Sequence, residues 1–186
     1  MHFYTFVIIG SEGDTETLVD RALAPFSDDL AVPQYRRYLD RYEVEHMANH
    51  YGIEKNNLHA LLKKMKDWTG NEGGIDGQRL YHLATYNPNG RWDWYEVGGR
   101  WDHYIKGSKR NVISARALLK SSRLKDCLPY HVLTPDGTWL EHERFIANGS
   151  LVGRLERKTD DAWLREVREA LERYIDRRVV CVDIHR

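Results

Sequence analysis

The chain has 186 residues, of which 28 are basic and 28 are acidic, and its mean hydropathy is −0.66. This length allows one domain with a sizeable core, or one domain with a small appendage. The balanced charge gives no support to a general nucleic-acid coat, which usually carries a positive surplus. Aromatic residues make up 11% of the chain, which argues against a disordered protein.

Cys127 and Cys181 are the only cysteines, too few for a disulfide scaffold or a four-thiolate zinc site. We therefore expect two reduced and mostly buried thiols. The first residues lack the basic region of a secretory signal, and no apolar run approaches the ~20 residues of a membrane span. These features predict a soluble, cytoplasmic protein without a membrane partner.

The first half of the chain predicts one strand followed by three helices. Residues 3–10 are rich in β-branched and aromatic side chains and indicate a buried strand. A helix follows that Pro25 ends. Two further apolar stripes predict a helical pair, the first closed by Gly52 and the second capped by Asn56 or Asn57. The stripes are Val44, Met47, Ala48 and Tyr51, and Leu58, Leu61, Leu62 and Met65.

The second half predicts two hairpins, a helix and a closing strand. After a glycine-rich loop at 69–77, two strands flank the turn Asn-Pro-Asn-Gly at 87–90. Residues 130–142 form a second hairpin around Pro-Asp-Gly. A short helix is expected at 114–120. Asp160 can cap a longer helix, and the last ten residues read as a strand.

This order of elements predicts an α+β fold with a largely antiparallel sheet and helices packed on one face. A ferredoxin-like arrangement, with the first and last strands in the centre of the sheet, is the best match within that class. We expect a single domain over residues 1–186, in which the helical pair at about 43–68 is a candidate insertion.

The segment "WDWYEVGGRW" (residues 92–101) concentrates three tryptophans, two glycines and an arginine. The glycines allow a sharp turn, the guanidinium suits a phosphate or carboxylate, and the indoles can stack on a ring. Alternation would place Trp92, Trp94 and Glu96 on one face of a strand. The segment could equally fill a core. The predicted ligand-binding residues are Trp92, Trp94, Tyr95, Gly98, Gly99, Arg100 and Trp101.

Acid–base or metal chemistry is the second hypothesis. Asp183 and His185 are two residues apart on the last strand and therefore share a face. The candidate catalytic residues are Asp93, Asp102, His103, Asp183 and His185. A histidine from elsewhere would have to complete a metal site, and the candidates are His82, His103, His131 and His142. Because the chain has no sequential metal motif, we predict no metal site and assign no cofactor.

A DNA-binding regulator is the third hypothesis. Ala48, Gly52 and Leu58 have the spacing of a helix-turn-helix, with a small residue, a turn glycine and a buried aliphatic residue. The second helix carries His59, Lys63, Lys64 and Lys66, which could contact DNA phosphates or could be an ordinary solvated face.

Several motifs together resemble a family of bacterial and phage proteins without a known activity. The family pattern combines Asn-Pro-x-Gly, Trp-Asp-Trp-Tyr-x-x-Gly-Gly-Arg-Trp, a Thr-Pro-Asp-Gly-x-Trp hairpin and a closing Val-Asp-x-His. The match covers roughly residues 79–140 and the last strand. The chain departs from the pattern after Trp139 and has Ile184 where the family has cysteine. The resemblance implies a shared fold and an accessory role, and it implies no reaction.

These observations favour a binding module for a phosphate-bearing small molecule, a nucleotide or a protein partner. The alternatives are a hydrolase that uses the Asp and His groups, and a DNA-binding regulator. An exposed tryptophan face could also be the interface of a homodimer.

Overall fold

The computed structural model describes residues 1–70, 72–105, 108, 110–121, 124–146 and 154–186. The chain forms two compact units, where the sequence predicts a single domain. Unit 1 comprises Met1–Leu30, Asn87–Arg144 and Arg157–Arg186, and unit 2 comprises Ala31–Tyr86 and Phe145–Glu156. The helical pair is therefore part of a larger inserted unit. Asn71 of the glycine-rich stretch, and residues 147–153 of the departure from the family pattern, lie outside the described residues.

Unit 1 is built on a mixed, mostly antiparallel sheet in the order β5-β11-β1-β7-β8, with β6 also paired to β11. The strands are β1 (His2–Ile9), β5 (Trp94–Val97), β6 (Val112–Ser114), β7 (His131–Leu133), β8 (Trp139–Glu141) and β11 (Arg178–His185). β1 and β11 pair along their whole lengths, whereas β1 and β7 run parallel. The predicted α+β class is confirmed, as is the central place of the first and last strands. The ferredoxin-like arrangement stays a prediction.

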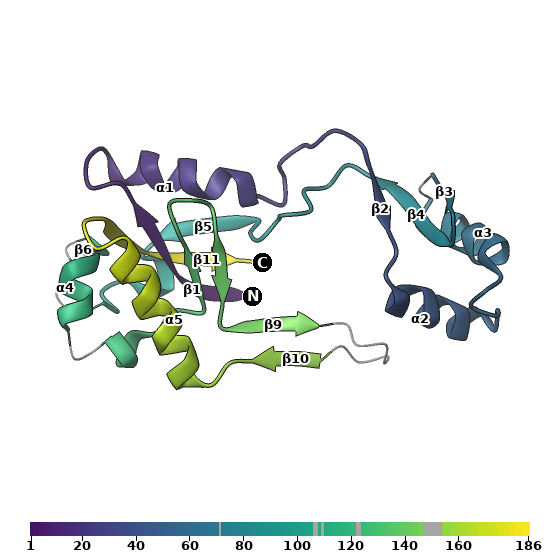
Figure 1. Cartoon of the computed structure of the whole chain (residues 1–186). Coiled ribbons are helices and arrows are strands. Elements are labelled where there is room, and N and C mark those ends of the chain that lie inside the picture. The colour runs from purple at the N-terminus through teal and green to yellow at the C-terminus, as the bar shows by residue number, and fades with distance from the viewer. Residues whose placement is uncertain (71, 106–107, 109, 122–123, 147–153) are drawn as a thin grey trace. The chain divides into compact units, whose positions relative to one another are not determined.

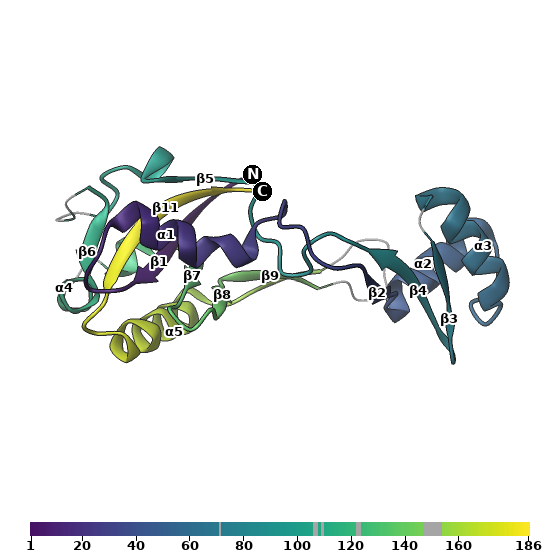
Figure 2. The ribbon, with the colours of Figure 1, turned by 90° about the horizontal axis from the view of Figure 1, so that it is seen from above.

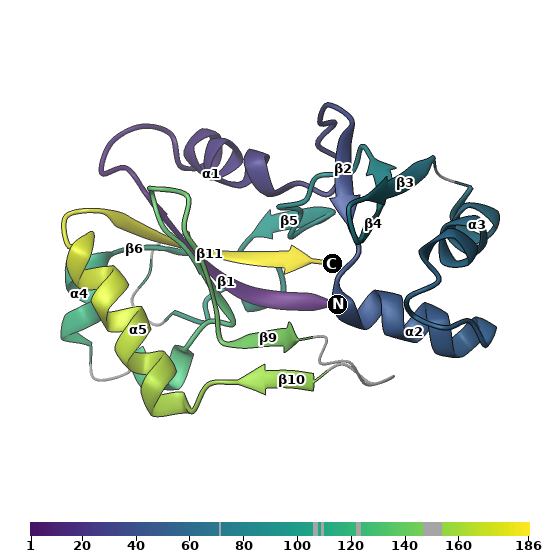
Figure 3. The same ribbon diagram turned by 45° about the vertical axis from the view of Figure 1, so that its right-hand side comes forward.

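Helices cover both faces of this sheet, so the expectation of helices on one face is wrong. The helices of unit 1 are α1 (Thr15–Leu23), α4 (Ala115–Lys120) and α5 (Asp160–Arg173), with 3-10 turns η1 (Ala24–Phe26), η2 (Gly99–Trp101) and η3 (Leu124–Cys127). Figures 1 and 3 show α1 on one side of β1 and β11, and α5 on the other.

The alternation of side chains along β1 explains the two layers. Tyr4, Phe6 and Ile8 pack into the core beneath α4 and α5, which we call the α5 face. Val7 and Ile9 point the other way, into the core beneath α1, which we call the α1 face. A strand buried on both faces has to be apolar at nearly every position, as this one is.

Local capping sets the helix starts. Asp14 accepts a hydrogen bond from the backbone of Thr17 at the start of α1. Thr159 does the same for α5, so the cap lies one residue before the predicted Asp160. A threonine hydroxyl and an aspartate carboxylate can both accept hydrogen bonds from the first free backbone amides of a helix. The sequence alone therefore does not distinguish between two neighbouring N-cap candidates.

Unit 2 is a three-stranded antiparallel sheet with a helical pair. Its elements are β2 (Tyr35–Tyr38), α2 (Arg41–Tyr51), α3 (Leu58–Thr69), β3 (Gly73–Asp76) and β4 (Arg79–Ala84), and the sheet order is β2-β4-β3. The core contains Met47, Ala48, Leu61, Met65 and Leu80. Gly52 ends α2 in the left-handed conformation, and Asn57 caps α3, as the sequence predicts. The β3–β4 hairpin can be followed to its turn in Figure 2.

Two predicted elements are wrong. The strands that flank Asn-Pro-Asn-Gly do not form a hairpin, because β4 belongs to unit 2 and β5 to unit 1. The Asn87 side chain instead donates to the carbonyls of Pro25 and Ser27, at 2.8 and 2.9 Å, and ties the turn to the end of η1. The glycine-rich stretch predicted as a loop also contains β3. Strands β9 (Glu143–Ile146) and β10 (Arg154–Arg157) form a separate two-stranded sheet.

Both cysteines are buried thiols, as predicted, and neither forms a disulfide with a described residue. Burial is the main cause that raises the pKa of the Cys181 thiol to about 12, and it also raises the pKa of Cys127. Thiols in this state are poor nucleophiles at neutral pH. Among the described residues, no helix combines the length and the apolar character that crossing a bilayer requires.

The half-buried His131 on β7 predicts that unit 1 is sensitive to acid. Burial lowers the pKa of His131 to about 4, against about 6.5 for histidine in an unfolded chain. Between these values the unfolded state binds more protons, so the free energy of unfolding falls as the pH decreases from 6.5 to 4. We expect His131→Phe to remove about 2 kcal/mol of this pH dependence. Urea unfolding at pH 7 and pH 4.5, followed by tryptophan fluorescence, measures it.

The exposed His103 provides the control. Its side chain is 83% exposed. The free energy of unfolding of His103→Gln should therefore fall by the same amount between pH 7 and pH 4.5 as that of the parent protein. An equal loss in the parent and in His131→Phe would show that other groups cause the acid sensitivity.

Candidate functional site

The carboxylate of Asp183 is buried in the middle of unit 1. It lies on β11, and its side chain is 1% exposed. One oxygen is 3.0 Å from Nδ1 of His2, and the other accepts a hydrogen bond of 3.1 Å from the backbone N–H of Arg100. A buried carboxylate needs such partners because its desolvation is costly. Strand pairing puts Tyr4 opposite Asp183 and His2 opposite His185.

The two glycines of the tryptophan segment form the corner that holds this carboxylate. Gly98 and Gly99 have φ values of 80° and 50°, which other residues rarely adopt. A Cβ atom on Gly99 would lie 2.6 Å from Cβ of Asp183, and one on Gly98 would overlap the side-chain amide of Asn111. The absence of both side chains lets the backbone turn over the carboxylate and donate the Arg100 N–H to it.

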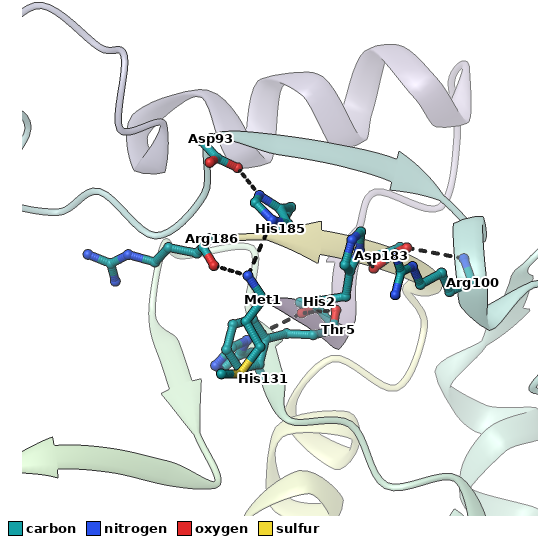
Figure 4. A network of polar contacts seen from close by, with 10 residues as sticks. Met1, His2, Thr5, Asp93, Arg100, His131, Asp183, His185 and Arg186 are labelled. Atoms are coloured by element: carbon teal, nitrogen blue, oxygen red, sulfur yellow. Dashed lines mark hydrogen bonds and ion pairs between the residues drawn. The ribbon is translucent and has the colours of Figure 1, made fainter.

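A second histidine–aspartate pair lies beside the first, as Figure 4 shows. Nδ1 of His185 is 2.7 Å from a carboxylate oxygen of Asp93. The His2 and His185 rings meet edge to face, with their centroids 4.9 Å apart. The hydrogen bond to His185 holds the pKa of the Asp93 carboxyl below its usual value. We call His2, Asp183, His185 and Asp93 together the histidine–aspartate site.

The site is open to solvent on one side. The side chains of His2 and His185 are 22% and 38% exposed. Trp94 is 46% exposed and lies edge to face with His2, with ring centroids 6.0 Å apart. The Arg100 side chain is exposed, and no ion pair to it occurs in the part of the chain that the structure describes. A flat aromatic ring and a guanidinium thus flank the two imidazoles.

The pairing of Nδ1 with a carboxylate defines what each imidazole can do. In its neutral form, each ring donates the Nδ1 proton to its aspartate and keeps a lone pair on Nε2. The aspartate fixes the tautomer and the ring orientation and stabilises the imidazolium when Nε2 takes a proton. His2 therefore has the arrangement of a general base. Nε2 of His185 lies 3.2 Å from the amino group of Met1.

The structure brings together the side chains of five predicted site residues, places Gly98 and Gly99 in the corner over Asp183, and separates the others. Asp93, Trp94, Arg100, Asp183 and His185 lie at or beside the histidine–aspartate site. Trp92 and Tyr95 pack instead on the α1 face, with ring centroids 4.9 Å apart, so the predicted alternation of Trp92 with Trp94 is wrong. The reason is that β5 begins only at Trp94, while the indole N–H of Trp92 is held by the carbonyl of Leu23.

The remaining predicted residues serve the turn or the core. Trp101 packs against the core of the α5 face. The Asp102 carboxylate accepts a hydrogen bond from the Asn111 side chain at 2.8 Å, and the backbone of His103 donates to the same side chain at 3.1 Å. Asp102 and His103 therefore close a loop and do not join the acid–base groups. Gly98 and Gly99 act through the backbone.

Sequence reasoning missed His2, although a signal for it was present. The prediction that the first and last strands are central neighbours implies that their ends face each other. An antiparallel pair of equal length places the second residue close to His185. Histidine at that position was therefore a candidate, but only the register of the pair could establish it.

The residues considered for metal binding do not converge. His82 lies on β4 in unit 2, and the His142 ring stacks on Trp163 and donates to the carbonyl of Lys158 at 3.0 Å. His131 lies near Thr5, with Nδ1 3.4 Å from the hydroxyl oxygen. Across the described ranges of the chain, no group of three or more His, Cys, Asp and Glu side chains is placed to hold a metal ion.

The lysines of the helical pair are mostly engaged within unit 2. Lys66 forms an ion pair of 3.3 Å with Glu72, and the Lys64 ammonium lies 5.5 Å from the centroid of the Tyr51 ring. This arrangement gives little support to a phosphate-contacting helix, so we place the candidate site in unit 1.

Comparison with known proteins gives no further guide. The chain matches no protein-family model, no curated protein and no solved structure. The family resemblance based on the tryptophan segment stays a prediction.

The fit of Gly99 against Asp183 can be tested by adding one methyl group. We expect Gly99→Ala to lower the free energy of unfolding by about 3 kcal/mol, because the Cβ atom combines a strained φ with an overlap in a packed site. Gly137→Ala is the matched control, since its φ is 82° and nothing lies within 4 Å of the added atom. Gly137→Ala should lower the free energy of unfolding by about 1 kcal/mol. Equal losses in denaturant unfolding would contradict a close approach at Gly99.

Proposed function

We propose that the protein binds a phosphate ester at the histidine–aspartate site and hydrolyses it by acid–base catalysis. The observation that carries the proposal is the buried Asp183 carboxylate, which holds Nδ1 of a histidine ring, His2, that is itself 22% exposed. A carboxylate that only filled space would be less favourable than an apolar residue of the same volume. Its use as an orienting group for an imidazole gives a reason for the buried charge.

Water supplies both the nucleophile and the proton of the leaving group. His2 accepts a proton at Nε2 from a water molecule as that water attacks phosphorus. The bond between phosphorus and the leaving oxygen breaks, and the leaving oxygen takes its proton from solvent. Asp93 holds the His185 ring beside His2 through Nδ1, and Nε2 of that ring lies 3.2 Å from the Met1 amino group. The products are the alcohol and the phosphate, and no oxidant or reductant is needed.

Two exposed groups beside the imidazoles are suited to hold the substrate. The guanidinium of Arg100 offers a planar fork that matches two phosphate oxygens. Its backbone N–H already fixes this residue to Asp183, so the position of the side chain is tied to the catalytic pair. The indole of Trp94 offers a flat surface for a ring of the substrate. Arg100 and Trp94 both belong to the ligand-binding residues that the sequence predicts.

The wider setting is an accessory role in a bacterium or phage, as the family resemblance implies. A protein partner or a homodimer remains compatible with such a role. If the protein binds a phosphate ester but does not hydrolyse it, the result would support the binding module that the sequence predicts and not the hydrolase.

Two chromogenic esters test the reaction: p-nitrophenyl phosphate and bis-p-nitrophenyl phosphate. We expect hydrolysis of at least one of them in the presence of EDTA. His2→Gln and Asp183→Asn should each lower kcat by about 100-fold or more, because the base or its orientation is lost. Arg100→Ala should mainly raise KM and leave thermal stability unchanged, since its backbone contact persists.

His103→Gln is the matched control, because His103 also pairs with an aspartate, at 3.3 Å, but lies outside the site. It should retain parent activity. Equal loss of activity in His2→Gln and His103→Gln, or hydrolysis that EDTA abolishes, would contradict metal-independent catalysis at this site.

A further inference from the structure

The sheet of unit 2 packs one face against α2 and α3 and carries arginine and tyrosine side chains on the other. Leu80 on β4 and Ile75 on β3 pack into the core with residues of both helices. Because side chains alternate along a strand, the positions beside them point away from the helices. The register aligns these outward positions across the three strands. Their charged and aromatic residues, which we call the arginine–tyrosine face, are Arg36, Tyr38, Asp76, Arg79 and Tyr81.

Each tyrosine ring of this face has a guanidinium over it. Cζ of Arg36 lies 4.7 Å from the centroid of the Tyr81 ring, and Cζ of Arg79 lies 4.1 Å from the centroid of the Tyr38 ring. These distances are within the range of cation–π interactions. The two rings are neighbours across β2 and β4, with centroids 5.8 Å apart. The contacts hold two otherwise flexible arginines in place, so the face is a preformed surface of alternating rings and cations.

The arginine–tyrosine face is open to solvent and carries more positive than negative charge. The side chains of Arg36 and Asp76 are 55% and 52% exposed and form an ion pair of 3.4 Å. The Asp76 carboxylate also accepts a hydrogen bond of 2.7 Å from the Tyr38 hydroxyl. Arg79 is exposed as well, and among the described residues no carboxylate forms an ion pair with it. One aspartate therefore faces two guanidinium groups, and the N–H groups of Arg79 are available to an anion.

We propose that the arginine–tyrosine face of unit 2 binds a single-stranded nucleic acid. Unpaired bases expose flat faces that stack on aromatic rings and on guanidinium planes, and the backbone phosphates pair with arginine. A duplex hides the faces of its bases, so this surface favours a single strand. An acidic peptide would pair with the cations but would gain less from the rings. The inference does not depend on the proposed hydrolysis, because it concerns unit 2 and its residues alone.

Fluorescence anisotropy with labelled oligouridylate and oligothymidylate of about ten nucleotides tests the proposal, since this length is within the usual site size. We expect at least one of them to bind at low salt, with an affinity that falls as salt is added, because the arginines displace counterions. A DNA duplex of equal length should bind more weakly. Replacing both arginines, Arg36→Gln together with Arg79→Gln, should weaken binding of the single strand about tenfold or more.

Further variants separate a binding role from a structural one. Asp76→Asn should tighten binding about threefold, because it removes a negative charge beside the strand. Tyr81→Leu should weaken binding about tenfold, whereas Tyr81→Phe should bind as the parent does, since stacking uses the ring and not the hydroxyl. The matched control is Lys63→Gln together with Lys64→Gln, which removes the same charge from exposed positions of α3. Thermal unfolding checks that each variant folds.

The possible outcomes are distinct. Preference for oligouridylate or for oligothymidylate supports the proposal and distinguishes RNA from DNA as the partner. Failure of both oligomers to bind at low salt overturns it, as does a duplex that binds as tightly as the single strands. Equal weakening by the arginine pair and by the lysine pair would show a general effect of charge and overturn the face as the site. Loss of binding in Arg100→Ala, with full affinity in the arginine pair, would place the strand in unit 1 and also overturn the proposal.

Discussion

A buried carboxylate in the central strand of a sheet is the constraint on which the rest of unit 1 depends. Asp183 lies where an apolar side chain would normally pack, and its charge has to be compensated from two distant segments. His2 supplies one contact from the first strand. The corner at Gly98 and Gly99 supplies the other, through a backbone N–H. The unusual composition of the tryptophan segment therefore reflects a different structural role at each position.

These structural roles can be assigned residue by residue. The glycines permit the approach to Asp183, Trp92 anchors the start of the segment beneath α1, and Trp101 fills the core on the opposite face. The exposed side chains of the segment are those of Asp93, Trp94, Glu96 and Arg100. A segment that looks like one aromatic binding surface in the sequence is in fact distributed over both layers of the fold.

Most of the central sheet could be predicted because its signals are local. The apolar first strand, the Pro-Asp-Gly turn and the closing strand each follow from alternation or turn chemistry. The failed hairpin at residues 87–90 shows the limit. The residues favour a turn, but the turn does not join two paired strands. The side-chain amide of Asn87 instead binds the carbonyl of Pro25, 62 positions away. No local pattern records that contact.

The site was predictable to a similar degree. The period of a strand placed Asp183 and His185 on one face, and the two glycines drew attention to the segment whose backbone turns over Asp183. The pairing of Asp183 with His2 and of His185 with Asp93 depends on register, which single-sequence patterns leave open.

The pairing of β1 with β11 also has a consequence for how the protein is made. The two strands lie at opposite ends of the chain, so β1 leaves the ribosome long before its antiparallel partner exists. During that time, an apolar strand with an open edge is a target for aggregation. Native contacts of such high sequence separation also slow folding. The carboxylate of Asp183 can gain its contact with His2 only after these two strands, far apart in the sequence, have paired.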